Sequence, residues 1–281
     1  MSWVAAKKHI ISRLVWRKKQ WLTIMEQLLH PYAYKPERYA KTFLARTSDS
    51  DDANITKPVP RVVYIFWTGD NEMSENRKRN LDIIRSKSGV EVKLITPKNL
   101  PEYVLPDHPL HPAYEYLSYV HRSDYLRCYF MNYYGGGYVD LKAISYAMTP
   151  MFDRLDASDA YVIGYGERNF EASAWYDEDD ANLRHDMYVY WNKLIGNCNY
   201  ICRPHTKFTE EWYAEICSRL DAHLEELKKH PSNQDPYAND ETGYPIKWTE
   251  ICGSVFHPLC LKYNKRLLRD RRMLPVFENY R

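Results

Sequence analysis

Two pairs of charged side chains near the middle of the sequence have types and spacings that suit ligand binding or catalysis. In HRSDYLRCYF, Asp124 and Arg127 stand three residues apart, so a helix would place them on one face. In GGGYVDLKA, Asp140 follows three glycines and a short apolar run, and Lys142 comes two residues later. Carboxylates accept hydrogen bonds from sugar hydroxyls or bind metals, and guanidinium groups donate to phosphate or sugar oxygens. The alternative for Asp124 and Arg127 is an ion pair within the helix, worth roughly 0.2–0.5 kcal/mol.

Alternating strand and helix signals are expected to bring these residues to one edge of a sheet. The apolar run VVYIFW, residues 62–67, predicts a buried strand of parallel-sheet type, and VEVKLIT, residues 90–96, predicts another. A helix is expected at 113–134, followed by the short strand that leads to Asp140. In open parallel sheets, ligands bind at the carboxyl ends of the strands. The segment FWTGD after the first strand and Asp140 after the later one therefore converge on one site.

The second half of the chain continues this pattern and supports an α/β fold. A strand is expected at 160–167, and a helix is expected to run into another strand through YVYWNKLIGNCNYICRP. A long amphipathic helix is predicted at 208–229. The polar stretch 230–245 has a length more typical of lids and binding loops than of simple connections.

The chain divides into three predicted parts: a basic amphipathic helical segment at 1–46, a linker at 47–60 and a main domain at 61–281. Residues 1–20 contain six lysines and arginines and no acid. Two interpretations of residues 1–30 stay open. The helix either docks on an anionic membrane surface or packs on its own domain.

Composition excludes some classes of function. The net charge is +2, and without residues 1–20 the remainder carries 33 basic and 37 acidic side chains, or −4. A near-neutral body argues against a nucleic-acid binder, which needs a broad basic surface. The 25 tyrosines and 8 tryptophans suit stacking on sugars. Six cysteines without a paired pattern indicate reduced thiols and a cytoplasmic location, either free or on the cytoplasmic face of a membrane.

The segments VVYIFWTGD and SDYLRCYFMNYYGGGYVDLKA resemble the DXD-type pattern of the capsular polysaccharide synthesis and glycosyltransferase family 32 group. That pattern has an apolar strand ending in W-x-G, then S-D-x-x-R, a helix and G-G-x-Y-x-D-x-D. The resemblance covers residues 61–150 well, is looser after them and is absent before residue 60. It implies a GT-A-like, Rossmann-type mixed sheet, mostly parallel, flanked by helices. It also implies retaining transfer of a hexosyl or pentosyl group from a nucleotide-diphosphate sugar, in the first place a UDP-sugar, to a hydroxyl of a glycan acceptor.

The resemblance also assigns roles to individual residues. It places Trp67 against the nucleobase, Asp124 and Arg127 on the donor sugar, and Asp140 on the ribose and any metal. Further positions expected to bind the donor are Thr68, Gly136, Gly137, Tyr138, Asn197 and His257. Beside the resemblance, Glu250 in KWTEICG is a candidate acid or base toward the acceptor, with a structural hydrogen-bonding role as the alternative.

This chain departs from the pattern at its metal motif, because it has Asp140-Leu141-Lys142 where D-x-D is expected. A single carboxylate seldom holds Mg²⁺ or Mn²⁺ unless substrate phosphates complete the shell. Three alternatives follow. Lys142 neutralises the diphosphate as a fixed cation. Alternatively, Asp140 and His257 still hold a metal together with the nucleotide phosphates. The third alternative is a degenerate site that binds a nucleotide sugar or glycan without catalysis.

Overall fold

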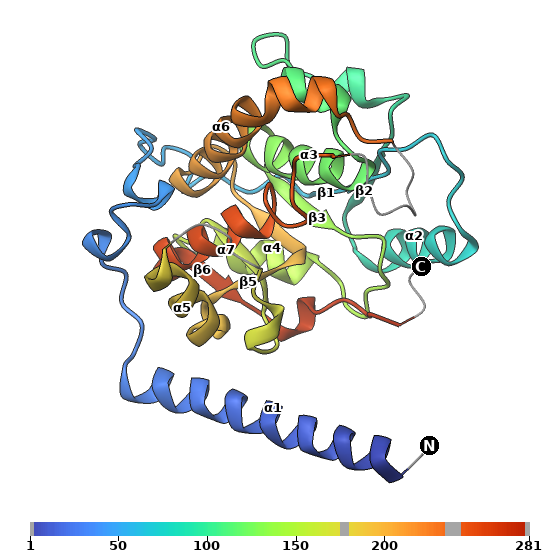
Figure 1. The fold of residues 1–281 in the computed structure, drawn as a ribbon. Helices are drawn as coiled ribbons and strands as arrows, with labels where there is room; N and C mark the ends of the chain where they lie inside the picture. Colours follow the sequence, from blue (N-terminus) through green and yellow to red (C-terminus); the bar gives the residue numbers. More distant parts are fainter. Residues whose placement is uncertain (1–2, 175–179, 234–242, 279–281) are drawn as a thin grey trace.

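A six-stranded mixed sheet forms the centre of the chain in the computed structural model, which describes residues 3–174, 180–233 and 243–278 (Figure 1). The strand order is β2-β1-β3-β5-β4-β6, and only β5 runs antiparallel to its neighbours. The strands are β1 Val62–Phe66, β2 Glu91–Ile95, β3 Gly136–Val139, β4 Val162–Gly166, β5 Ile195–Cys202 and β6 Leu267–Arg269. The predicted Rossmann-type, mostly parallel α/β sheet is confirmed.

Helices cover both faces of this sheet, and the sequence of β1 shows why. Val62, Tyr64 and Phe66 point into one apolar core, whereas Val63 and Ile65 point into the other. Successive side chains of a strand alternate between faces, so a continuous apolar run buries both of them. The α-helices are α1 Trp3–Leu29, α2 Glu75–Lys87, α3 Tyr119–Tyr133, α4 Thr149–Asp156, α5 Ala181–Val189, α6 Lys207–Lys229 and α7 Gly253–Lys262.

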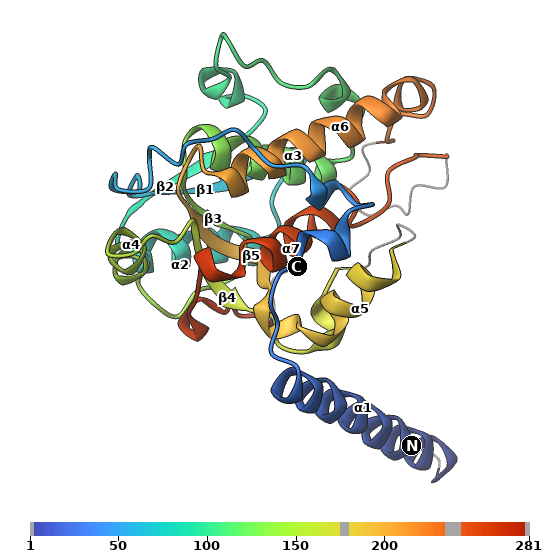
Figure 2. The same ribbon diagram turned by 90° about the vertical axis from the view of Figure 1, so that its left-hand side faces the viewer.

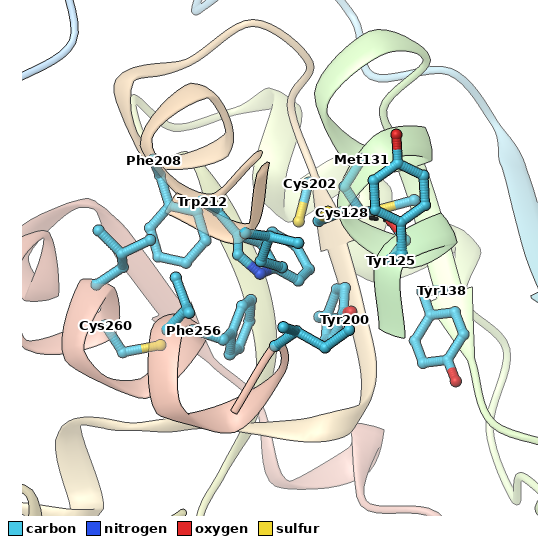
Figure 3. Packing of buried hydrophobic residues seen from close by; sticks show 14 of the residues in the cluster. Tyr125, Cys128, Met131, Tyr138, Tyr200, Cys202, Phe208, Trp212, Phe256 and Cys260 are labelled. Carbon is cyan, nitrogen blue, oxygen red and sulfur yellow. Dashed lines mark hydrogen bonds between the residues drawn. The ribbon is translucent and has the colours of Figure 1, made fainter. Parts of the chain in front are cut away.

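The larger core lies between the sheet and α3, α6 and α7, and the smaller core lies under α2 and α4. Aromatic rings fill the larger core (Figure 3). The ring of Phe256 on α7 lies 4.8 Å from that of Trp212 on α6 and 4.9 Å from that of Tyr200 on β5. These contacts fix the helices that flank the candidate site against the sheet.

The helix predicted at 113–134 is interrupted. A short 3₁₀ turn, Pro112–Tyr116, comes first, and α3 then begins after Ser118, whose side chain accepts a hydrogen bond from the His121 amide at 3.2 Å. Ser118 is therefore an N-cap that satisfies an otherwise unpaired amide. Of the three glycines after α3, the last two lie inside β3.

The N-terminal part of the chain combines a peripheral helix with two buried turns. In both views α1 lies along the outside of the molecule (Figure 1 and Figure 2). The 3₁₀ turns Pro36–Tyr39 and Phe43–Ala45 join the larger core through Tyr39, Phe43 and Leu44. Within the described ranges, no helix is long and apolar enough to cross a membrane.

Candidate active site

The candidate site lies where the carboxyl end of β3 meets the first residues of the antiparallel strand β5. Val139 pairs with Asn199 across the two strands. Directly beyond this pair, the Asp140 amide donates a hydrogen bond to the Cys198 carbonyl at 2.8 Å. Because β5 runs in the opposite direction, its beginning lies at the edge where the parallel strands end. Residues near 140 and near 198 are thereby brought into contact across the sheet.

Asp140 has a partner on each of its carboxylate oxygens. The Tyr138 hydroxyl donates to Oδ1 at 2.5 Å, and the Lys142 ammonium forms an ion pair with Oδ2. Lys142 Nζ also contacts the Cys198 sulfur at 3.3 Å. Lys142 is thus folded back onto the carboxylate two residues before it, at the position where the D-x-D pattern would have its second acid.

The electrostatics of this pair keep both members charged. Burial alone would raise the pKa of Asp140, but Lys142, Arg127 and Tyr138 outweigh it and hold the pKa below its usual range. Burial opposes the charge of Lys142 as well, yet Asp140 raises its pKa. Burial and Asp140 raise the pKa of the neighbouring Cys198 thiol to about 12, so this thiol stays neutral.

Asp124 and Arg127 lie on the buried face of α3, as the predicted helix requires. Their side chains form an ion pair at 2.8 Å and are 4% and 9% exposed, so this is no solvated surface pair. Arg127 also donates to the Asn197 carbonyl at 3.0 Å, and its guanidinium carbon lies 4.5 Å from the centre of the Tyr138 ring. Its buried Nε has no hydrogen-bond partner within the part of the chain that the structure describes.

The two ion pairs are linked into one network through Tyr138. The ring of Tyr138 contacts Arg127, and its hydroxyl donates to Asp140, which in turn binds Lys142. Burial raises the pKa of the Asp124 carboxyl against the attraction of Arg127. Two cations and two acids therefore share one largely buried cluster, in which each charge depends on the others.

Asn197 and His257 form a second polar group beside this network. Nδ1 of His257 accepts a hydrogen bond from the Ala174 amide at 2.9 Å, so the neutral ring carries its proton on Nε2. Nε2 lies 3.2 Å from the Asn197 side-chain amide and 3.5 Å from a Glu167 oxygen. Nε2–H of the fully buried His257 points its proton toward Glu167 rather than Asn197, because the Asn197 nitrogen is itself a donor.

The donor set does not fit a metal site built by the protein. The two oxygens of Asp140 are engaged by Tyr138 and by a lysine. Of the His257 ring nitrogens, Nδ1 accepts from the Ala174 amide and Nε2 carries the proton, so neither has a lone pair for a metal. Across the described ranges, no group of three or more histidine, cysteine or acidic side chains has a geometry that could hold a metal ion. Mg²⁺ and Mn²⁺ need several oxygen ligands, and Asp140 and His257 alone do not supply them.

The end of β1 carries Trp67 and Thr68. Trp67 is partly buried, and its indole N–H donates to the Asn71 carbonyl at 2.8 Å. The Thr68 hydroxyl donates to the Tyr119 carbonyl at 2.5 Å and ties β1 to the start of α3. Thr68 also borders a cavity of about 570 Å³ that the sequence did not reveal. Its lining is Thr68, Pro97, Leu100, Pro101, Val104, Leu110, Tyr114 and Arg122.

Packing within the protein accounts for Gly136 and Gly137. Gly136 has φ +88°, which favours glycine, and a Cβ on it would lie 2.7 Å from the Val62 carbonyl oxygen. A Cβ on Gly137 would lie 3.0 Å from a Val63 methyl group. These glycines allow β3 to lie against β1, toward the end of the strand away from Asp140.

Glu250 is held by groups outside the network of α3 and β3. One carboxylate oxygen lies 2.7 Å from His223 Nε2, and the other accepts from the Lys247 amide at 2.9 Å. These contacts match the second interpretation of Glu250, in which its carboxylate makes structural hydrogen bonds. They leave Glu250 as a partly exposed carboxylate whose oxygens already have partners.

Residues that the sequence analysis did not single out also contact the predicted set, among them Cys198, Cys252, Glu167 and Phe277. The first three contact Lys142, Arg127 and His257, respectively. The Phe277 ring lies between two cations, 4.5 Å from the Arg168 guanidinium and 5.6 Å from the Lys142 ammonium. Glu167 ends a predicted strand and could have been noticed, whereas nothing in the sequence pointed to Phe277.

A family model described as capsular polysaccharide synthesis protein matches residues 18–215, which is more than two thirds of the chain. The matched region includes β1, α3, β3 and β5, and so contains both ion pairs of the site. No curated protein and no solved structure matches the chain.

Proposed function

Because the chain belongs to the capsular polysaccharide synthesis protein family, we propose that it is a glycosyltransferase. It transfers a sugar from a nucleotide-diphosphate sugar to a hydroxyl group of a growing glycan. The observation that carries the proposal is the buried network that joins Asp124 and Arg127 to Asp140 and Lys142 at the carboxyl edge of the sheet. Ligands of open α/β sheets bind at this edge.

The reaction requires little covalent chemistry from the protein. The bond between the anomeric carbon and the diphosphate oxygen breaks, and the diphosphate leaves with the electron pair. The acceptor oxygen forms the new bond to the anomeric carbon, and its proton passes to the leaving diphosphate or to water. Positioning and electrostatic stabilisation of the leaving group supply most of the rate in such a mechanism.

Each charged residue of the network has a role in this proposal. Asp124 accepts hydrogen bonds from donor-sugar hydroxyls. Arg127, whose Nε has no partner among the residues that the structure describes, donates to the sugar or the diphosphate. Asp140 accepts from the ribose. Lys142 supplies positive charge to the leaving diphosphate, turning from Asp140 toward the phosphate when the donor binds.

The remaining groups complete the donor site. We place the nucleobase against Trp67 at the end of β1, where the indole, held by the Asn71 carbonyl, offers a surface for a planar ring. Asn197, whose backbone carbonyl accepts from Arg127, contributes to the donor-sugar site in this proposal. In this proposal the donor is a UDP-sugar and the transfer retains the configuration of the anomeric carbon. The chain then also belongs to the wider glycosyltransferase family 32 group. A cytoplasmic location is also part of the proposal, and the six free cysteines support it.

The proposal is tested by donor turnover, followed by NMR across a panel of UDP- and GDP-sugars, each with Mn²⁺ and with EDTA. We expect one donor to be hydrolysed slowly without acceptor and to be consumed in both conditions. Lys142→Ala should lower this rate by about 10²-fold, as for other groups that stabilise developing charge. Lys229→Ala, at the exposed end of α6, is the matched control and should leave the rate unchanged. Activity that EDTA abolishes would instead assign the neutralising role to a metal at Asp140.

A binding protein without catalysis is the second candidate, and the Asp140–Lys142 pair is the observation that favours it. The pair is satisfied internally and lacks the second acid of the D-x-D pattern. Saturable binding of a nucleotide sugar, with no turnover in Mn²⁺ or EDTA, would support this function over the first.

A further inference from the structure

The helix α1 has two faces with different environments. One face lies against the body of the protein. Trp16 packs its ring 5.9 Å from Phe170 and donates to Glu171 at 2.8 Å, and Gln27 donates to the Val189 carbonyl. Thr23, which is 3% exposed, accepts from the Trp191 indole at 3.1 Å. Spacings of seven and four residues place Trp16, Thr23 and Gln27 in one row along the helix.

The other face of α1 carries large apolar side chains in contact with solvent. They form two rows along the helix. In each row the second residue lies four positions after the first, and the third and fourth each lie seven positions after the one before. Their exposed fractions range from 48% to 69%. The first row is Ile10, Leu14, Trp21 and Leu28, and the second is Ile11, Val15, Leu22 and Leu29.

The same helix is strongly basic. Arg13, Arg17, Lys18 and Lys19 are all exposed, and Glu26, near its carboxyl end, is its single acid. Long basic side chains can lie along an apolar surface while their charges reach the lipid headgroups. The remaining body of the protein is slightly acidic, so the positive charge is concentrated on this one element.

We propose that α1 docks on an anionic membrane surface. The apolar rows enter the boundary between headgroups and acyl chains, and the flanking arginines and lysines bind the acidic lipids. The opposite row, including Trp16 and Thr23, meanwhile holds the body of the protein against the helix. A second copy of the chain is disfavoured as the occupant, because pairing two such faces would bring like charges together.

Vesicle sedimentation of the full chain, without any substrate, tests this docking independently of sugar transfer. We expect binding to phosphatidylcholine vesicles with about one third phosphatidylglycerol to exceed binding to phosphatidylcholine alone by at least about tenfold. The double variant Leu14→Glu, Trp21→Glu should weaken that binding by at least about tenfold, since it places acids in the apolar rows. Trp248→Glu is the matched control, because Trp248 is 71% exposed elsewhere on the molecule, and it should bind as the wild type does.

Charge is tested separately with Arg17→Glu, Lys18→Glu. It should also lower binding by at least about tenfold, and added salt should weaken wild-type binding. Lys228→Glu, Lys229→Glu changes the net charge equally on exposed positions of α6 and should bind as the wild type does. Equal binding to both vesicle types, or full binding by the Leu14, Trp21 variant, would overturn the proposal. So would light scattering that shows a dimer which this variant dissociates.

Discussion

Two buried arginines in this molecule differ in the groups that surround them. Arg203 is fully buried, and its guanidinium donates to the backbone carbonyls of Lys57, Leu155, Ser158 and Ala160. Leu155 lies in the last turn of α4, where unpaired carbonyls and the helix dipole favour a cation. All these acceptors are neutral and fixed by the backbone.

Arg127 is also buried, but its partners are of another kind. It pairs with the carboxylate of Asp124, lies over the Tyr138 ring and has a buried Nε without a partner in the described residues. Burial lowers the pKa of Arg203. Burial opposes the charge of Arg127 too, but Cys252, Tyr138 and Asp124 outweigh it and raise the pKa of Arg127. Arg203 is saturated by backbone carbonyls, whereas Arg127 retains hydrogen-bonding capacity beside other titratable groups within the described residues.

The comparison predicts its largest effect for Arg203→Met. The substitution would leave several buried carbonyls without donors, and we expect it to lower the free energy of unfolding by about 4 kcal/mol. Urea unfolding followed by circular dichroism measures this. Arg85→Met, at an exposed position of α2, should change stability little. A cost below about 1 kcal/mol would mean that water replaces Arg203 readily.

A smaller effect on stability, but a large one on activity, is expected for Arg127→Lys. The lysine keeps the charge and loses the planar, multidentate geometry, so donor turnover should fall by about 10²-fold. The free energy of unfolding should change by less than about 2 kcal/mol, because the charge of Asp124 stays compensated. If Arg127→Lys instead lost stability as Arg203→Met does and kept its activity, the contrast between the two arginines would be wrong.

The smallest effect is a difference in pH dependence. The folded state lowers the pKa of Asp140, so its stabilising contribution is present above the unfolded value of 3.8 and is lost as the pH falls through the folded pKa. The stability difference between wild type and Asp140→Asn should therefore narrow as the pH is lowered below about 4. The corresponding difference for Arg203→Met should stay constant, because backbone carbonyls do not titrate. Urea unfolding at neutral and acidic pH compares the two, and equal pH dependence would contradict the distinction.

Local patterns in the sequence were sufficient for much of the fold. The apolar run of β1 predicted a buried strand, and side chains of this strand are buried in both apolar cores. The spacing of Asp124 and Arg127 correctly placed both on one face of α3. Strand alternation and helix periodicity depend on backbone geometry alone, so a single sequence carries them.

The contacts of the site depended instead on how distant segments pack. Asp140 binds Tyr138 with one oxygen and Lys142 with the other. This arrangement follows from the turn after β3, which no residue pattern specified. Asn197 and Cys198 reach the site only because β5 runs antiparallel with its particular register. Likewise, α1 has one face against the body of the protein and one exposed apolar face only because α5 and its neighbouring turns pack against the first.

The sequence by itself therefore determined several elements of this protein, β1 and α6 among them, and the residues of α3 that could share a face. Only the tertiary structure decided which charges are saturated and which retain capacity for a ligand. The physical reason is that secondary structure follows from the repeat of the backbone over a few residues. The partners of a buried charge are set instead by strand register and by helix packing between distant segments. Arg127 and Cys252, for example, are in contact although they lie more than a hundred residues apart in the sequence.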